Sequence, residues 1–228
     1  MQKKLNVGDY INRICILVGM WFFIELIQLP VAFIARVDQI AAKLLLIVVY
    51  FGMYAGAIAI AWHYYRQYHP EPVGKMTRGN VMLVVIAYVL FMIFQAVMIL
   101  LSNAVYHQAS SENNDSIQRI LSSSHLTMVV MLIGIVILSP IVEELVFRGM
   151  IVDGLFKTAP IIWPMLVSGV AFAMAHAFSN PFLFLAYGGM GATMVYLYRK
   201  TGTLKTNISF HMLNNLIASL GMLPLLFK

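Results

Sequence analysis

Charge is scarce in this sequence. Only 11% of its 228 residues are Asp, Glu, Lys or Arg, against roughly 25% in ordinary soluble domains, and 61% are hydrophobic. This shortage excludes a soluble globular domain and predicts one compact domain embedded in a membrane. The formal net charge is +6, but the basic residues lie at the ends of apolar runs. That placement is typical of topology signals and lipid-headgroup contacts, so we expect membrane lipids and no nucleic acid as partners.

Cysteine is also nearly absent. The single Cys15 excludes an intramolecular disulfide and a cysteine-based metal cluster, and its apolar neighbours indicate that it packs against other helices. The H-E-x-x-H helix of zinc proteases, the G-x-S-x-G nucleophile turn and the Gly-rich phosphate loop are missing too. The common signatures of zinc peptidases, serine hydrolases and nucleotide-binding proteins are therefore not available to explain its function.

Long apolar runs, in contrast, are abundant. Runs of about 20 apolar residues are long enough to cross the hydrocarbon core as helices. They predict an all-α, polytopic membrane bundle of about seven transmembrane helices, at 14–35, 44–62, 81–101, 126–147, 160–178, 182–198 and 206–226. In the second run, Gly52-x-x-x-Gly56 is a small-residue pattern suited to close helix packing.

The loops between these runs indicate the orientation. The stretches 63–80 and 199–205 are rich in Lys and Arg, whereas 102–125 is polar and carries Glu112 and Asp115. The positive-inside rule then predicts a multi-pass protein of the cell membrane with a cytoplasmic N-terminus and an external 102–125 loop. Lys3 and Lys4 precede a first run that is too long for a signal peptide, so we expect an uncleaved span.

A few strongly polar residues interrupt the later runs. Glu143, Glu144 and Arg148 follow an uncharged stretch, Phe172 and His176 lie in the fifth run, and His211 and Asn215 in the seventh. Charges at membrane depth are costly and persist mainly when they pair, face the protein interior or do chemistry. Glu144 and Arg148 have the i,i+4 spacing of an ion pair, which leaves Glu143 without an equally obvious partner.

Peptide hydrolysis is a reaction that this set of side chains could catalyse. A carboxylate and a histidine can hold and deprotonate a water molecule, and a second histidine with an asparagine can stabilise an oxyanion. The same carboxylate and imidazole groups, Glu143, His176 and His211, are also a possible ligand set for Zn²⁺. A structural role for all of these residues is the alternative interpretation, as is a proton relay in a transporter.

The three motifs together resemble a known family. E-E-x-x-x-R, F-x-x-x-H and H-x-x-x-N, each on its own predicted membrane helix, are similar to the CAAX-protease and bacteriocin-processing (CPBP or Abi) family of intramembrane endopeptidases. The resemblance covers residues 125–228, the predicted catalytic core in the last four helices, whereas 1–124 carry no matching motif. It implies a hydrolase that cuts a peptide or membrane-protein substrate near the cytoplasmic face, as a glutamate protease or a metalloprotease, with possible roles in bacteriocin processing or immunity.

The resemblance also implies residue roles. Glu143 and His176 would activate water, His211 and Asn215 would form the oxyanion site, and Glu144, Arg148 and Phe172 would support them. For these groups to meet, the fourth helix must continue beyond the predicted span, toward Phe156, so that the fifth helix also begins above the membrane. We then expect one water-filled cavity open to the cytoplasm. A non-catalytic membrane protein of the same fold, binding a partner in immunity, is the alternative function.

Overall fold

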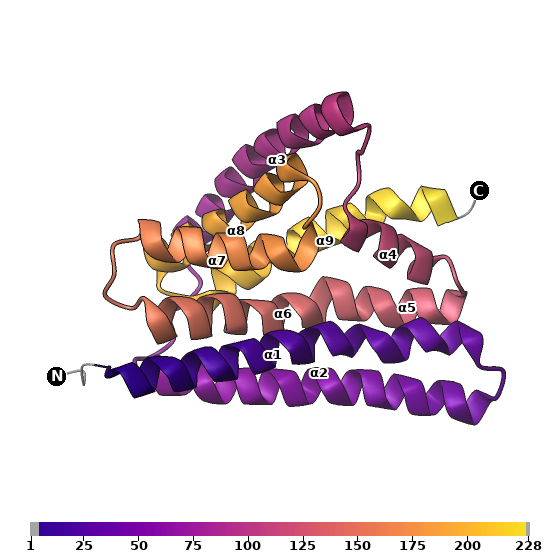
Figure 1. The fold of residues 1–228 in the computed structure, drawn as a ribbon, viewed down its shortest axis with the longest axis horizontal. Helices are drawn as coiled ribbons and strands as arrows, with labels where there is room; N and C mark the ends of the chain where they lie inside the picture. Colours follow the sequence, from indigo (N-terminus) through magenta and orange to yellow (C-terminus); the bar gives the residue numbers. More distant parts are fainter. Residues whose placement is uncertain (1–4, 227–228) are drawn as a thin grey trace.

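The computed structural model describes the backbone of residues 5–226 and the side chains of residues 5–222; Lys3, Lys4 and Lys228 lie outside this range. Helices make up all the regular structure of the described chain, as the sequence predicts (Figure 1). They are α1 (Val7–Phe33), α2 (Ile40–Tyr68), α3 (Arg78–Tyr106), α4 (Glu112–Leu121), α5 (His125–Ile133), α6 (Ser139–Glu144), α7 (Ile162–His176), α8 (Pro181–Thr201) and α9 (Leu204–Leu226), with the short segments η1 (Ile34–Arg36), η2 (Gly134–Leu138) and η3 (Leu145–Asp153).

Each of the seven predicted runs is helical, but seven membrane spans are not confirmed. In the described residues, four stretches are long and apolar enough to cross a membrane: Val7–Arg36, Ile40–Tyr68, Arg78–Tyr106 and His125–Asp153. Helix α7 has only 15 residues, about 22 Å at 1.5 Å per residue, which is less than a hydrocarbon core of about 30 Å. One face of α7 packs against α8 and η3, and its other face is apolar and exposed.

The short helices pack against the long ones. Figure 1 shows α1 and α2 side by side as one layer, with the helix that runs from α5 through η3 lying along them. Helices α7, α8 and α9 pack on the other side of that helix, and α3 lies against α8. The 10-residue helix α4, which the sequence analysis took as loop, lies beside α5. Outward-facing side chains of α1, α2 and α3 are largely apolar and exposed, as expected for contact with lipid.

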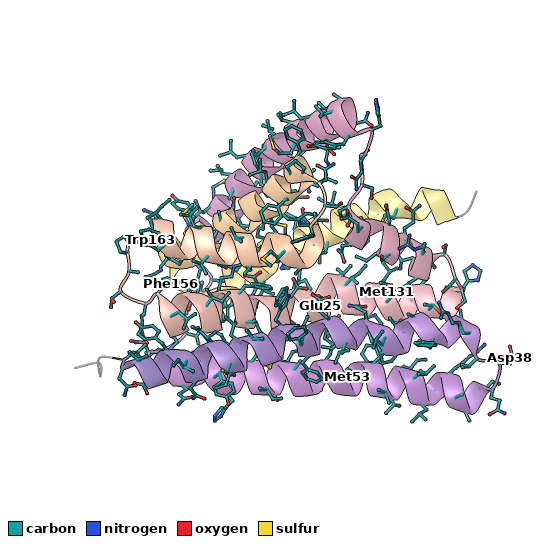
Figure 2. All side chains as sticks on the ribbon, viewed as in Figure 1. Glu25, Asp38, Met53, Met131, Phe156 and Trp163 are labelled. Carbon is teal, nitrogen blue, oxygen red and sulfur yellow. The ribbon has the colours of Figure 1, made fainter. Side chains whose placement is uncertain are left out.

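The bundle has two chemically different ends. The N-terminus and the loops 69–77, 154–161 and 202–203 lie at one end, where Figure 2 labels Phe156 and Trp163. We call this the basic end, after Arg66, Lys75, Arg78, Lys157, Arg199, Lys200 and Lys205 in or next to these loops. The opposite end holds Asp38 and helix α4, and we call it the α4 end; the turn between α7 and α8 lies nearer the middle of the bundle, beside the start of α4.

Close helix packing occurs at a different place from the one predicted. A Cβ on Gly52 or Gly56 would meet no atom within 4 Å, so this pair makes no tight contact. A Cβ on Gly169 of α7 would instead lie 2.9 Å from the carbonyl oxygen of Gly188 in α8. A Cβ on Gly191 would lie 2.8 Å from the Cα of Gly169. The small residues that bring two backbones together are therefore those of α7 and α8, beside the polar motifs.

The polar helix runs without interruption from His125 to Asp153. It extends beyond the predicted end at residue 147, in the direction that the sequence analysis required. Its η2 and η3 segments have wider, π-helical turns, a geometry often found at functional sites. Glu143 and Glu144 lie on α6, between these two segments.

Candidate active site

Glu143 is the centre of the polar cluster. Its side chain is 9% exposed, and Ser139, one turn earlier on the same helix, donates a hydrogen bond to Oε1. The other oxygen, Oε2, is buried and has no hydrogen-bond partner among the described residues. A buried carboxylate oxygen without a partner is costly. It therefore marks a position where a bound molecule, water or substrate, is expected.

Two histidines face that oxygen. Nε2 of His176 and Nε2 of His211 each lie 3.8 Å from Oε2 of Glu143. This distance is too long for a direct hydrogen bond, but one water molecule could contact all three atoms. The structure thus brings together Glu143 and His176 from two helices, as the sequence analysis expected. They do not lie at opposite membrane surfaces.

The hydrogen bonds of His176 define its tautomer. Nδ1 lies 2.8 Å from the carbonyl oxygen of Phe172, which can only accept, so Nδ1 carries the proton. In the neutral ring, Nε2 is then a hydrogen-bond acceptor that points toward Glu143. Two acceptors, one carboxylate oxygen and one imidazole nitrogen, can each receive one O–H of the same water molecule.

His211 is held by a chain of buried charges. Its Nδ1 lies 3.0 Å from Oε1 of Glu144, and the same oxygen accepts a 2.9 Å hydrogen bond from Arg148. The side chains of Glu144 and Arg148 are fully buried. Arg148 also donates to the carbonyl oxygen of Gly191 in α8, at 3.1 Å. The predicted i,i+4 ion pair of Glu144 and Arg148 is present. Glu144 also positions the imidazole of His211.

Phe172 supports both histidines. Its ring stacks on His176 with centroids 4.3 Å apart and meets His211 edge-on at 5.6 Å. The guanidinium carbon of Arg148 lies 5.3 Å from the centroid of the Phe172 ring. The aromatic residue of the second motif therefore holds the imidazoles and the arginine at fixed spacings.

Asn215 lines the same cavity but makes a contact that its motif did not predict. Its Nδ2 donates to the carbonyl oxygen of Ile135 at 2.8 Å, in the π-helical segment η2. The amide has a second N–H that this bond does not use. Asn215 is close to the expected position, but one of its two donors has a structural role.

Three contributors to the site were not identified from the sequence. Ser139 has a local signal, since it lies four residues before Glu143. Tyr187 of α8 stacks on His176 with centroids 4.9 Å apart, and Gly191 supplies a backbone oxygen to Arg148. Neither residue has a marker in the sequence, because both contacts depend on how α8 packs against its neighbours.

The assignment of Glu143, His176 and His211 as Zn²⁺ ligands stays a prediction. No group of three or more His, Cys, Asp and Glu side chains in the described part of the chain is placed to hold a metal ion, and this includes Glu143, His176 and His211. Each imidazole has its Nε2 atom 3.8 Å from Oε2 of Glu143.

A cavity of about 630 Å³ contains the cluster. Glu143, Phe147 and His211 form its inner part, and its outer part is lined by α4 residues such as Asn113 and by the turn after α7. It therefore opens at the α4 end. The sequence analysis expected the N-terminus and the cavity mouth on the same side of the membrane, but the structure places them at opposite ends, because helix packing closes the basic end.

Comparison with known proteins identifies the second part of the chain. Residues 125–217 match the family model "Type II CAAX prenyl endopeptidase Rce1-like". A protein of Bacillus subtilis (strain 168) named "Putative membrane peptidase YdiL" is 30% identical over 105 residues. Residues 125–217 belong to the Rce1-like family. This Rce1-like segment contains all the motif residues from Glu143 to Asn215, and helices α1 to α3 lie outside it.

The match to YdiL is partial for both proteins. It covers 46% of this chain and 41% of YdiL, so the chain spans less than half of the length of that relative. No solved structure matches. The Rce1-like segment thus gives the family, and the activity of the whole protein is the subject of the proposal below.

Proposed function

We propose that this protein is an intramembrane endopeptidase in which Glu143 activates a water molecule. The observation that carries the proposal is the buried Oε2 of Glu143, which lacks a partner and faces two imidazoles inside a cavity. Oε2 of Glu144 is also buried without a partner, but Glu144 is paired with Arg148 through its other oxygen and does not line the cavity, whereas Glu143 does. The family of residues 125–217 supports the same reaction class.

The first step uses Glu143 and His176. Both groups accept hydrogen bonds from one water molecule, which fixes its lone pair toward a substrate carbonyl carbon. Glu143 then takes a proton as the water oxygen bonds to that carbon, and the carbonyl oxygen becomes an oxyanion. His176, with its proton on Nδ1, orients the water and needs no proton of its own at Nε2.

The second step uses His211 and Asn215. The oxyanion requires donors, and a donor at Nε2 of His211 requires a doubly protonated ring, because Nδ1 already donates to Glu144. Glu144 is positioned to stabilise that imidazolium. Asn215 can add its second N–H. When the oxyanion collapses, the C–N bond breaks and Glu143 returns its proton to the leaving amine, which yields a carboxylic acid and an amine.

Peptide cleavage by the reconstituted protein tests this proposal. The purified chain in lipid nanodiscs is incubated with a mixed peptide library, and new termini are identified by mass spectrometry. Glu143→Gln keeps the size of the side chain but removes the base, so cleavage should fall by about 100-fold or more, since general bases contribute roughly 10² to 10⁴. Asp38→Asn, at an exposed position outside the cavity lining, is the control and should cleave like the parent.

Two results would contradict the proposal. One is undiminished cleavage by a folded Glu143→Gln protein, and the other is the absence of any cleavage by the parent. The second result would favour the alternative function, a non-catalytic membrane protein that binds a partner. Processing of a bacteriocin, or immunity to one, is the biological role that the family resemblance adds, and the same pair of variants tests it in cells.

A further inference from the structure

The cavity extends in one direction only. Its inner part lies at Glu143 and His211, near the middle of the bundle, where Figure 2 also labels Glu25 of α1. From there its lining continues to Ile117 and Ile120 of α4, to Ser179 and to Met222. No described residue of the basic-end loops lines it. A molecule that reaches Glu143 through this cavity therefore comes from the α4 end.

Hydrogen bonds close the opposite end. Asp153, the last residue of the polar helix, accepts a 2.9 Å hydrogen bond from Nδ1 of His69 and another from the hydroxyl of Tyr198. Arg199 donates to the carbonyl oxygen of Lys157 at 2.7 Å. These bonds connect α2, η3, α8 and two loops across the basic end. The route from this end to Glu143 is filled by packed side chains.

Lys157 adds a further connection at the same end. Its Nζ lies 3.0 Å from each carboxylate oxygen of Glu71 and 3.1 Å from the carbonyl oxygen of Tyr68. The hydrogen bond from Lys157 lowers the pKa of the Glu71 carboxyl, so the pair is charged at neutral pH. The basic end is thus held together by ionic contacts in a loop region that lies outside the membrane spans.

The distribution of basic residues indicates which side of the membrane each end of the bundle faces. Eight described Lys and Arg residues lie toward the basic end: Arg13, Arg66, Lys75, Arg78, Lys157, Arg199, Lys200 and Lys205. Three lie toward the α4 end: Arg36, Lys43 and Arg119. Each end also has three acidic residues, Asp9, Glu71 and Asp153 at the basic end and Asp38, Glu112 and Asp115 at the α4 end, so the difference lies in the basic residues. The positive-inside rule places the first group in the cytoplasm. The cavity mouth then faces the other side.

We propose that the cavity is entered from the extracytoplasmic side, and that its substrate class is a peptide segment exposed at the outer membrane surface. The substrate class rests on the proposed function, whereas the side of entry rests on the cavity and the charges alone. It differs from the cytoplasmic cleavage that the sequence analysis expected. A secreted peptide or an external segment of a membrane protein has this location.

Helix α4 forms part of the entrance and is connected to the candidate active site. The hydroxyl of Tyr187 lies 3.1 Å from Oγ of Ser111, at the start of α4, and donates to Oδ1 of Asn114 at 3.1 Å. The ring of Tyr187 stacks on His176. A peptide that enters the cavity past α4 therefore contacts a helix that Tyr187 connects to His176.

Single-cysteine labelling tests the side of entry. In a Cys15→Ala background, which removes the exposed native thiol, Ser116→Cys and Ser179→Cys report on the entrance, and Lys75→Cys and Lys200→Cys report on the basic end. Intact cells are treated with a membrane-impermeant maleimide, before or after permeabilisation. We expect the two entrance positions to be labelled in intact cells and the two basic-end positions to be labelled only after permeabilisation.

Labelling of Lys75→Cys or Lys200→Cys in intact cells would overturn this inference, and so would entrance positions that react only after permeabilisation. The same labelling in a Glu143→Gln protein separates the two proposals, because it needs no catalysis. If the entrance is labelled from outside but no peptide is cleaved, the proposed function fails and the side of entry stands.

Discussion

Arg148 is the residue on which the polar cluster depends most. It is fully buried, and it contacts Glu144, the Gly191 carbonyl and the Phe172 ring. Its removal leaves Glu144 as an uncompensated buried charge, and breaking such a pair costs about 3–5 kcal/mol. We expect Arg148→Ala to lower the thermal unfolding temperature in detergent as well as activity. Arg119→Ala, at an exposed arginine, should leave the unfolding temperature nearly unchanged.

The opposite outcome for this arginine is informative. If Arg148→Ala protein unfolds at the parental temperature but does not cleave peptides, Arg148 acts on the substrate, and its role is catalytic. A stable, inactive variant would then move it into the same group as Glu143.

Whether peptide cleavage requires a metal ion depends on the roles of Glu143, His176 and His211. The steps proposed for Glu143 and His176 use water and side-chain atoms only, so we expect peptide cleavage to survive exhaustive treatment with a chelator. Cleavage that is lost on chelation and restored by added Zn²⁺ would instead make Glu143, His176 and His211 metal ligands, the other arrangement that the sequence allows. A parallel unfolding measurement shows whether the chelator has changed stability.

At the residue scale, most of the candidate site could be predicted, and the reason is local spacing. The i,i+4 relations of Glu144 with Arg148 and of Phe172 with His176 are properties of one helix each, so they can be seen in the sequence. The bond from Asn215 to Ile135 could not be predicted. It depends on a carbonyl oxygen in a π-helical turn of another helix, and neither the turn nor the neighbour is encoded by a short motif.

Helices α7 and α8 depend on glycine at their contact. A Cβ on Gly169 would lie 2.9 Å from a backbone oxygen of α8, which cannot move away as a flexible side chain could. Overpacking typically costs about 1–3 kcal/mol. We expect Gly169→Ala to lower the unfolding temperature and to reduce activity, because Phe172 and His176 follow on the same helix.

Gly52→Ala is the matched control for this prediction. The new methyl group would meet no atom within 4 Å, and alanine is the better helix former by about 1 kcal/mol in water. The unfolding temperature should stay the same or rise. Equal destabilisation by both substitutions would contradict the assignment of the close contact to α7 and α8.

Element types were predictable and element contacts were not. Apolar length and composition identified every long helix, but the Gly52-x-x-x-Gly56 pattern of α2 makes no close contact, because such patterns are common by chance in apolar sequence. Helix α4 was missed because its 10 residues are polar and carry no apolar run. Its position follows from contacts with Tyr187 and Ser179, which are distant in sequence.

For the whole molecule, closure of the basic end is the property that can be tested directly. Asp153 accepts hydrogen bonds from His69, directly after the end of α2, and from Tyr198 of α8. Asp153→Ala leaves these donors without a partner, at a typical cost of about 1–3 kcal/mol. We expect a lower unfolding temperature, with the entrance positions still labelled only from the α4 end. The control is Asp115→Ala, at the α4 end.

New access from the basic end would contradict that expectation in an instructive way. A Cys at His211 that becomes reactive in inside-out vesicles of Asp153→Ala, but not of the parent, would show that these hydrogen bonds alone keep the cavity closed on that side. The direction of the cavity could not be predicted from sequence, because it depends on which end of the bundle is filled by side chains, and apolar runs do not report this.

The ion pair within one helix has a consequence for biogenesis. The segment His125–Asp153 brings Glu143, Glu144 and Arg148 into the bilayer while the helices that later surround it have yet to be synthesised. Glu144 and Arg148 can neutralise each other as soon as their shared turn forms, because the pair needs no second helix. The penalty for insertion then falls mainly on Glu143, whose histidine neighbours arrive last from the ribosome.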